Sequence, residues 1–160
     1  MVKLSSDLSE FIALLNSHRV EYLIVGGHAV AYHGHPRFTG DIDFLLRPST
    51  ENANLVIAAL RDFGFGALAL KAADLTVPGQ VVQLGRPPNR IDLLTSISGV
   101  EFEEAWSSRI PAILGGEAVN FLGWDALLRN KEASGRDKDS VDLKKLLAIA
   151  EAKRTQGKRG

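Results

Sequence analysis

The chain has 160 residues, of which 45% are hydrophobic, so it has the size of one domain and can bury about 70% of the surface that the unfolded chain exposes. Lysine and arginine together number 19, as do aspartate and glutamate, so no overall field favours binding to nucleic acid or to an anionic membrane. The chain has no cysteine, which excludes disulfides, thiolate zinc sites and a cysteine nucleophile.

Hydropathy along the chain indicates neither a membrane span nor a targeting segment. No apolar run in the sequence approaches the ~20 residues that a membrane helix requires. The first residues lack the apolar segment and the small-residue cleavage site of a signal peptide. We therefore expect a soluble, cytoplasmic protein without a membrane partner.

The spacing of apolar residues predicts short strands that alternate with helices. The predicted helices span residues 7–16, 28–32, 49–64, 70–74, 100–106, 124–133 and 139–150. The predicted strands span residues 22–25, 41–46, 81–84, 90–94, 110–114 and 118–122. This order predicts an α/β or α+β fold in which helices flank a mixed β-sheet. We assign residues 1–152 to a single domain and the basic residues 153–160 to a flexible tail.

Two acidic residues, Asp41 and Asp43, lie two positions apart on a predicted strand. Side chains alternate between the faces of a strand, so both carboxylates point the same way, about 6.6 Å apart. That spacing suits a pair of divalent cations, which clamp the attacking and leaving oxygens in displacement at phosphorus. Oxygen ligands favour Mg²⁺, with Mn²⁺ as the alternative cation. A solvent-facing side of a strand would give the same pattern without any metal.

The strand at residues 22–25 ends in Gly26-Gly27, and a short helix is predicted to follow. Backbone N–H groups exposed at such a turn can bind phosphate oxygens. Arg37 is suited to clamping a phosphate through two hydrogen bonds, and Thr39 offers a hydroxyl nearby. The alternatives are an ordinary glycine turn and two surface residues.

A third carboxylate, Asp92, lies between aliphatic residues on a predicted core strand. A carboxylate in that position is costly unless it meets a metal or a hydrogen-bond donor. We therefore expect Asp92 to be the third metal ligand and to accept the proton of an attacking hydroxyl. An outward-facing position on an alternating strand is the competing interpretation.

Several histidine and tryptophan residues invite a functional interpretation that their positions do not favour. His28, His33 and His35 lie on a helix and a loop, where nothing enforces the geometry of a zinc site, so we expect polar surface residues. Trp106 and Trp124 occupy amphipathic helix positions and are expected in the core.

Together these motifs resemble the nucleotidyltransferase superfamily, which includes polymerase-beta-like enzymes. The resemblance rests on Gly26-Gly27, thirteen intervening residues, the Asp41-Ile42-Asp43 motif and the later Asp92, and it is closest over residues 22–46. The Gly-Gly-His-Ala sequence and the arginine and threonine before the acidic motif resemble a small bacterial branch related to AbiEii-type toxin nucleotidyltransferases.

The resemblance implies that Asp41, Asp43 and Asp92 hold two Mg²⁺ ions and that the glycine turn holds the triphosphate. The C-terminal segment resembles a lysine and Lys-Asp-x-x-Asp-Leu pattern of these proteins. It implies that Lys131 or Lys138 meets triphosphate oxygens while acidic neighbours fix those cations. Helix capping by charged residues is the alternative for this segment.

The expected function is metal-dependent transfer of a nucleoside monophosphate from a nucleoside triphosphate such as ATP to an acceptor hydroxyl on RNA, protein or a small molecule. The resemblance also implies a toxin of a toxin–antitoxin pair, with a cognate antitoxin or a second copy of the chain as partner. Many active members carry serine where this chain has Gly27. A catalytically degenerate module that binds nucleotide or a partner protein is therefore the alternative function.

Overall fold

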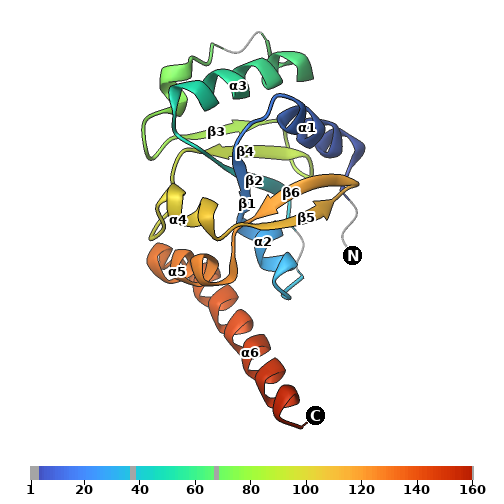
Figure 1. The fold of residues 1–160 in the computed structure, drawn as a ribbon, viewed down its shortest axis with the longest axis vertical. Helices are drawn as coiled ribbons and strands as arrows, with labels where there is room; N and C mark the ends of the chain where they lie inside the picture. The colour runs from blue at the N-terminus through green and yellow to red at the C-terminus, as the bar shows by residue number, and fades with distance from the viewer. Residues whose placement is uncertain (1–3, 37–38, 67–68, 160) are drawn as a thin grey trace.

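The computed structural model describes residues 4–36, 39–66 and 69–159. Its centre is a six-stranded sheet in the order β3-β4-β2-β1-β6-β5 (Figure 1). The strands are β1 Tyr22–Val25, β2 Asp41–Leu46, β3 Val81–Leu84, β4 Arg90–Leu94, β5 Ile110–Leu114 and β6 Glu117–Phe121. β2 pairs parallel to β4 and β1 parallel to β6, whereas the remaining neighbours are antiparallel. The predicted mixed sheet with flanking helices is confirmed.

The helices surround this sheet (Figure 1). They are α1 Ser6–Ser17, α2 Gly26–Tyr32, α3 Thr50–Leu60, α4 Phe102–Ser107, α5 Trp124–Ser134 and α6 Asp137–Arg159, with a π-helical turn at Arg61–Phe65 and a 3₁₀ turn at Ala72–Leu75. All predicted helices are present within a few residues of their expected bounds except α6, which is longer.

The core forms where helix α1 packs against the central strands. Ser5 caps α1 by accepting a hydrogen bond from the Leu8 N–H, which satisfies one of the free donors of the first turn. The buried residues of α1 recur at helical spacing, so one face of the helix is apolar. On that face Phe11 packs edge-on against Phe44 of β2, and Tyr22 of β1 contacts Phe44 in the same way. β1 and β2 are thereby held in the interior.

The sheet register determines which side chains become neighbours at the site. Val25 at the end of β1 lies opposite Asp43, and Asp43 lies opposite Asp92 on β4. Asp41 lies opposite Arg90 in the same parallel ladder. Because facing residues on paired strands project to the same side, these charged side chains gather on one face of the sheet.

Helix α6 runs for 23 residues, beyond the predicted end at residue 150, so residues 153–159 are helical. Apolar periodicity stops near residue 150, but the alanine, lysine, arginine and glutamine that follow are strong helix formers. The side chains of residues 151–157 are all exposed, and this end of α6 projects from the body of the protein (Figure 1). Although α6 is long it is polar, and none of the described helices combines the length and hydropathy needed to cross a membrane.

Candidate active site

The structure brings Asp41, Asp43 and Asp92 together, and we call them the carboxylate trio. One oxygen from each lies within 4.8 Å of the others. The parallel pairing of β2 with β4 places Asp43 beside Asp92, while alternation along β2 puts Asp41 on the same face and buries Ile42. The predicted placement of the first two carboxylates on one face is therefore present, with oxygens closer than the expected separation of about 6.6 Å, and Asp92 joins them. Their roles in metal binding and catalysis remain predictions.

Gly26 makes room for one member of the carboxylate trio. Its φ of +67° is in the left-handed region, and a Cβ built on it would lie only 2.1 Å from Oδ2 of Asp43. Both the backbone conformation and the contact require glycine here. The first glycine of the predicted phosphate turn therefore also determines where the Asp43 carboxylate sits.

Asp43 is the member of the trio with the least electrostatic support. Its Oδ1 atom is buried and has no hydrogen-bond partner among the described residues. Burial, together with the negative charges of Asp41 and Asp92, raises the pKa of Asp43 to about 7. A buried carboxylate without a donor is costly when ionised, so this position favours a cation or a proton.

Arg90 bridges the other two carboxylates and is a site residue that the sequence analysis missed. Its Nη2 atom is 2.5 Å from Oδ2 of Asp41, and its Nε atom is 3.0 Å from Oδ1 of Asp92. The signal was available, because Arg90 lies two residues before Asp92 on a predicted strand and must share its face. A guanidinium therefore offsets part of the negative charge of the trio.

The pKa values of Asp41 and Asp92 shift in opposite directions. Burial alone would raise the pKa of Asp41, but hydrogen bonds from Thr39 and Arg90 lower it below its ordinary value. Burial raises the pKa of Asp92, and the opposing hydrogen bond from Arg90 does not cancel this effect. The Thr39 hydroxyl, predicted to face a phosphate, lies 3.0 Å from Oδ1 of Asp41 in this structure.

His28 is buried at the site, so its expected surface position was wrong. Only 9% of the residue is exposed, because helix α2 packs against β1 and β2. Burial lowers the pKa of His28, while a hydrogen bond to the Asp41 backbone opposes that shift. The His28 ring thus lies within hydrogen-bonding distance of the Asp41 backbone. His33 and His35 are half-buried.

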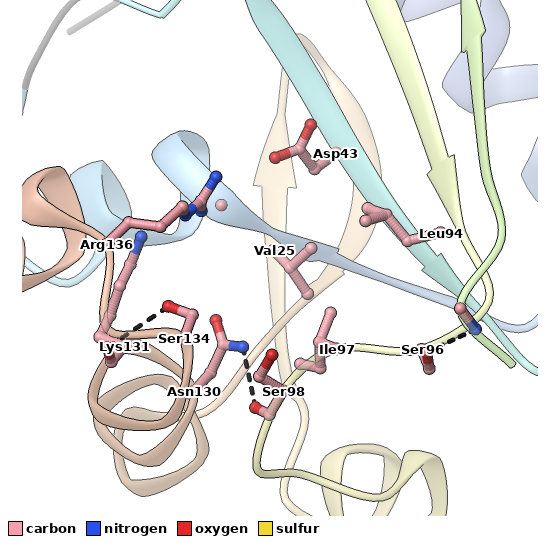
Figure 2. Close-up of a pocket in the computed structure, with 12 residues that line it drawn as sticks. Val25, Asp43, Leu94, Ser96, Ile97, Ser98, Asn130, Lys131, Ser134 and Arg136 are labelled. Carbon is pink, nitrogen blue, oxygen red and sulfur yellow. Dashed lines mark hydrogen bonds between the residues drawn. The ribbon is translucent and has the colours of Figure 1, made fainter.

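A cavity of about 520 Å³ opens beside Asp43. Its wall comes from the end of β1, from β2 and β4, from the loop after β4 and from α5 and its junction with α6 (Figure 2). The lining residues are Val25, Gly26, Asp43, Gly79, Leu94, Ser96, Ile97, Ser98, Asn130, Lys131, Ser134 and Arg136. This volume lies in the range of small-molecule and cofactor sites.

Lys131 lines the cavity but is only 3% exposed. Its Nζ atom lies 3.0 Å from Asp139 and 3.1 Å from Asp142, and we call these three residues the Lys131 cluster. Asp139 also accepts hydrogen bonds from Ser134 and Arg136, which together with Lys131 outweigh burial and hold its pKa well below the usual range. Acidic neighbours thus fix Lys131, as expected for this segment.

The remaining predicted phosphate-binding residues are less closely associated with the cavity. Lys138 is exposed, but its positive charge lowers the pKa of Asp43, so it lies within electrostatic reach of the trio. Arg37 lies outside the described residues. Arg136, which was not predicted to bind nucleotide, lines the cavity and its pKa is raised chiefly by Asp139 and also by Asp43.

The carboxylate trio fits the divalent cations that the family resemblance implies. It offers hard oxygen ligands that Mg²⁺ and Mn²⁺ prefer, and the unpartnered buried oxygen of Asp43 is placed to ligate. Arg90 neutralises only part of the charge. The residues present therefore suit a site for divalent metal.

No protein-family model matches the sequence, and no curated protein matches it. Solved structures do match. A crystal structure of ANT(2")-Ia in complex with adenylyl-2"-tobramycin is 15% identical, with a TM-score of 0.54 over 93% of this chain and 90% of that chain. The chain has the nucleotidyltransferase fold.

A second structure with this fold is that of an antigenic nucleotidyltransferase-like protein from Paracoccidioides brasiliensis. It is 18% identical, with a TM-score of 0.53 over 92% of this chain and 78% of that chain. The nucleotidyltransferase fold therefore extends over almost the whole chain, which confirms the predicted fold. The AbiEii-related branch is not among these findings and stays a prediction.

We predict that Asp43→Asn stabilises the metal-free protein at about pH 8. The folded-state pKa near 7 exceeds the unfolded value of about 4, so the favourable contribution of the protonated form is lost as pH rises between these values. Asparagine cannot ionise, so we expect a gain of about 2 kcal/mol near pH 8 that shrinks near pH 5.

Denaturant unfolding without divalent ions measures this difference. Asp125→Asn, at an exposed position of α5, is the control and should leave stability unchanged. A variant of Asp43 that is no more stable than the wild type near pH 8 would contradict the buried, unsupported carboxylate.

Replacing Arg90 should have the opposite effect. Arg90→Met leaves Asp41 and Asp92 without their bridging guanidinium, so we expect a lower melting temperature in metal-free buffer and recovery when Mg²⁺ is added. Arg154→Met, which removes an exposed pair with Glu151 on α6, is the matched control. An equal loss with and without Mg²⁺ would mean that Arg90 and the cation do not stabilise the same carboxylates.

Proposed function

We propose that the protein is a metal-dependent nucleotidyltransferase that moves a nucleoside monophosphate from a nucleoside triphosphate to an acceptor hydroxyl and releases pyrophosphate. The observation that carries this proposal is the carboxylate trio, whose oxygens lie within 4.8 Å of one another. The cavity beside Asp43 and the nucleotidyltransferase fold support it.

In this proposal Asp41, Asp43 and Asp92 hold two Mg²⁺ ions. When bound, these ions neutralise the triphosphate and stabilise the charge on the attacking and leaving oxygens. Gly26 lets the Asp43 carboxylate approach the end of β1 closely. The backbone at Gly26 thus helps to fix the position of Asp43, one of the proposed metal ligands. Such preorganisation removes the need to rearrange charged groups during the reaction.

The basic residues that line the cavity are proposed to bind the triphosphate. Lys131 is held by two carboxylates, so it approaches the ligand from a fixed position, while Arg136 presents a more exposed guanidinium. Lys138 contributes longer-range charge. The backbone of Gly26 and Gly27 and the Arg37 side chain complete the predicted phosphate contacts. The Thr39 hydroxyl donates to Asp41 in this structure, so it would have to turn from Asp41 to reach a phosphate.

The acceptor step needs a base, and Asp92 is proposed for this role. Burial raises its pKa, which makes its ionised form a stronger proton acceptor than an exposed carboxylate. The acceptor oxygen forms a bond to the α-phosphorus while the bond from that phosphorus to the oxygen bridging the β-phosphate breaks. Pyrophosphate leaves with the bonding electrons, and Asp92 takes the proton of the hydroxyl.

We expect Asp41→Asn and Asp43→Asn each to reduce transfer by at least about 100-fold, because each removes charge from the cation site. Incubation with each α-phosphate-labelled triphosphate and Mg²⁺, against RNA, protein and small-molecule fractions, measures the transfer and identifies the acceptor class. Asp125→Asn is the control and should transfer normally.

The same assay separates the enzyme from a degenerate binding module. Transfer by the wild type that survives in the Asp41→Asn, Asp43→Asn double variant would contradict the mechanism. Mg²⁺-dependent thermal stabilisation by a triphosphate, without labelling of any fraction, would instead identify a module that binds nucleotide only.

The resemblance to AbiEii-type proteins extends the proposal to a toxin whose partner is a cognate antitoxin. In that case controlled expression of the wild type in bacteria should arrest growth, because the modified acceptor is essential, whereas expression of Asp43→Asn at the same level should not. Growth arrest by both proteins, or by neither, would count against a toxin that acts through nucleotidyl transfer. Size measurement of the purified chain tests the alternative partner, a second copy.

A further inference from the structure

Helix α5 presents two polar side chains to the cavity at positions four residues apart. Asn130 and Ser134 both line it, and residues at this spacing lie on the same face of a helix, about 5–6 Å apart. Figure 2 shows both on one side of the cavity, with Asp43 on the other. The hydrogen bonds that each already makes determine what it can offer a ligand.

Asn130 is fixed as a hydrogen-bond acceptor. Its amide nitrogen lies 3.0 Å from the carbonyl oxygen of Ser98. A carbonyl oxygen can only accept, so the NH₂ group must face it and the amide oxygen must face the other way. Figure 2 shows this oxygen directed away from Ser98, and within the described part of the chain no donor reaches it. The group that Asn130 leaves for a ligand is a carbonyl.

Ser134 is limited to accepting as well. Its Oγ atom lies 2.7 Å from Oδ2 of Asp139 and 3.4 Å from the Lys131 carbonyl oxygen. Both neighbouring oxygens can only accept a hydrogen bond: one is a carbonyl, and Arg136 and Lys131 keep the Asp139 carboxylate ionised. The single hydroxyl hydrogen of Ser134 is therefore committed to one of these two oxygens. The described residues donate no hydrogen bond to Ser134 Oγ. Its lone pairs are therefore what it offers to the cavity.

We infer that Asn130 and Ser134, the acceptor pair, bind the ribose hydroxyls of the nucleoside triphosphate and make the site select ribonucleotides over deoxyribonucleotides. This inference rests on the proposed function. Two acceptors on one helical face match a ligand with two neighbouring donors, and the 2′ and 3′ hydroxyls of ribose are such a pair. Lys131 and Arg136 line the same cavity and offer N–H donors to the phosphates attached to that sugar.

The open cavity limits how strong this selection is. Losing one neutral hydrogen bond at a partly solvated site lowers affinity by about 3- to 10-fold. The wild type should therefore bind ATP more tightly than 2′-deoxyATP or 3′-deoxyATP by about that factor. Because the exocyclic amine of adenine is another donor, inosine triphosphate, which lacks it, is included as a probe and should bind like ATP.

Titration of wild type and variants with these triphosphates and Mg²⁺, followed calorimetrically, tests the inference. Asn130→Leu and Ser134→Ala should each reduce the preference for ATP over a deoxy analogue toward one, while Ser134→Thr, which keeps a hydroxyl, should retain it. Glu132→Ala, at an exposed position on the same helix, should behave like the wild type. Melting curves verify that each variant is folded.

The outcomes separate this inference from the function on which it rests. Equal binding of ATP and both deoxy analogues by the wild type, or an unchanged preference in Asn130→Leu and Ser134→Ala, overturns the ribose assignment but leaves nucleotide binding intact. A loss of affinity for inosine triphosphate alone assigns the acceptor pair to the base and also overturns it. Absence of binding by every triphosphate overturns the proposed function as well.

Discussion

Three carboxylates share a small volume in this protein, and much of the surrounding structure serves to make that arrangement tolerable. Their oxygens approach within 4.8 Å, where like charges repel and raise one another's pKa. Arg90 takes part of the charge through Asp41 and Asp92, whereas Asp43 is left with a buried, unpartnered oxygen. A divalent cation would relieve this repulsion, so the electrostatic cost of the cluster and the proposed metal binding have the same origin.

In the Lys131 cluster, on the same side of the protein, the buried charge is positive and its partners are carboxylates. A buried ammonium would be expensive alone, and Asp139 and Asp142 neutralise it. Because Lys131 belongs to α5 and both carboxylates belong to α6, these contacts also fix the junction between the two helices that forms one wall of the cavity. Asp139, one of these two carboxylates, also accepts a hydrogen bond from the hydroxyl of Ser134. The carboxylate that neutralises Lys131 thus leaves Ser134 able only to accept a hydrogen bond from a ligand.

Much of the fold could be predicted because it depends on local patterns. Apolar runs and turn residues located all six strands, and the two-residue period placed Asp41 and Asp43 on one face. The α6 end was missed because apolar periodicity stops before the helix does. Burial of His28 depends on helix α2 packing against two strands, which no local pattern contains. The two-residue period could also have placed Arg90 on the face that carries Asp92. Its contact with Asp41 could not be predicted in this way, because the two residues are 49 positions apart in the chain.

By itself, the sequence determined the mixed α/β architecture and the identity of the acidic residues, because alternation and glycine turns are properties of neighbouring residues. Only the tertiary structure decided that Asp92 lies beside Asp43, that the Gly26 position must lack a side chain because Asp43 fills that space, and that Arg90 bridges two carboxylates. It also decided that Asn130 and Ser134 offer only hydrogen-bond acceptors to the cavity. Each of these features depends on the register between distant strands or on the packing of α5 against α6, and long-range pairing is not encoded in any short stretch of sequence.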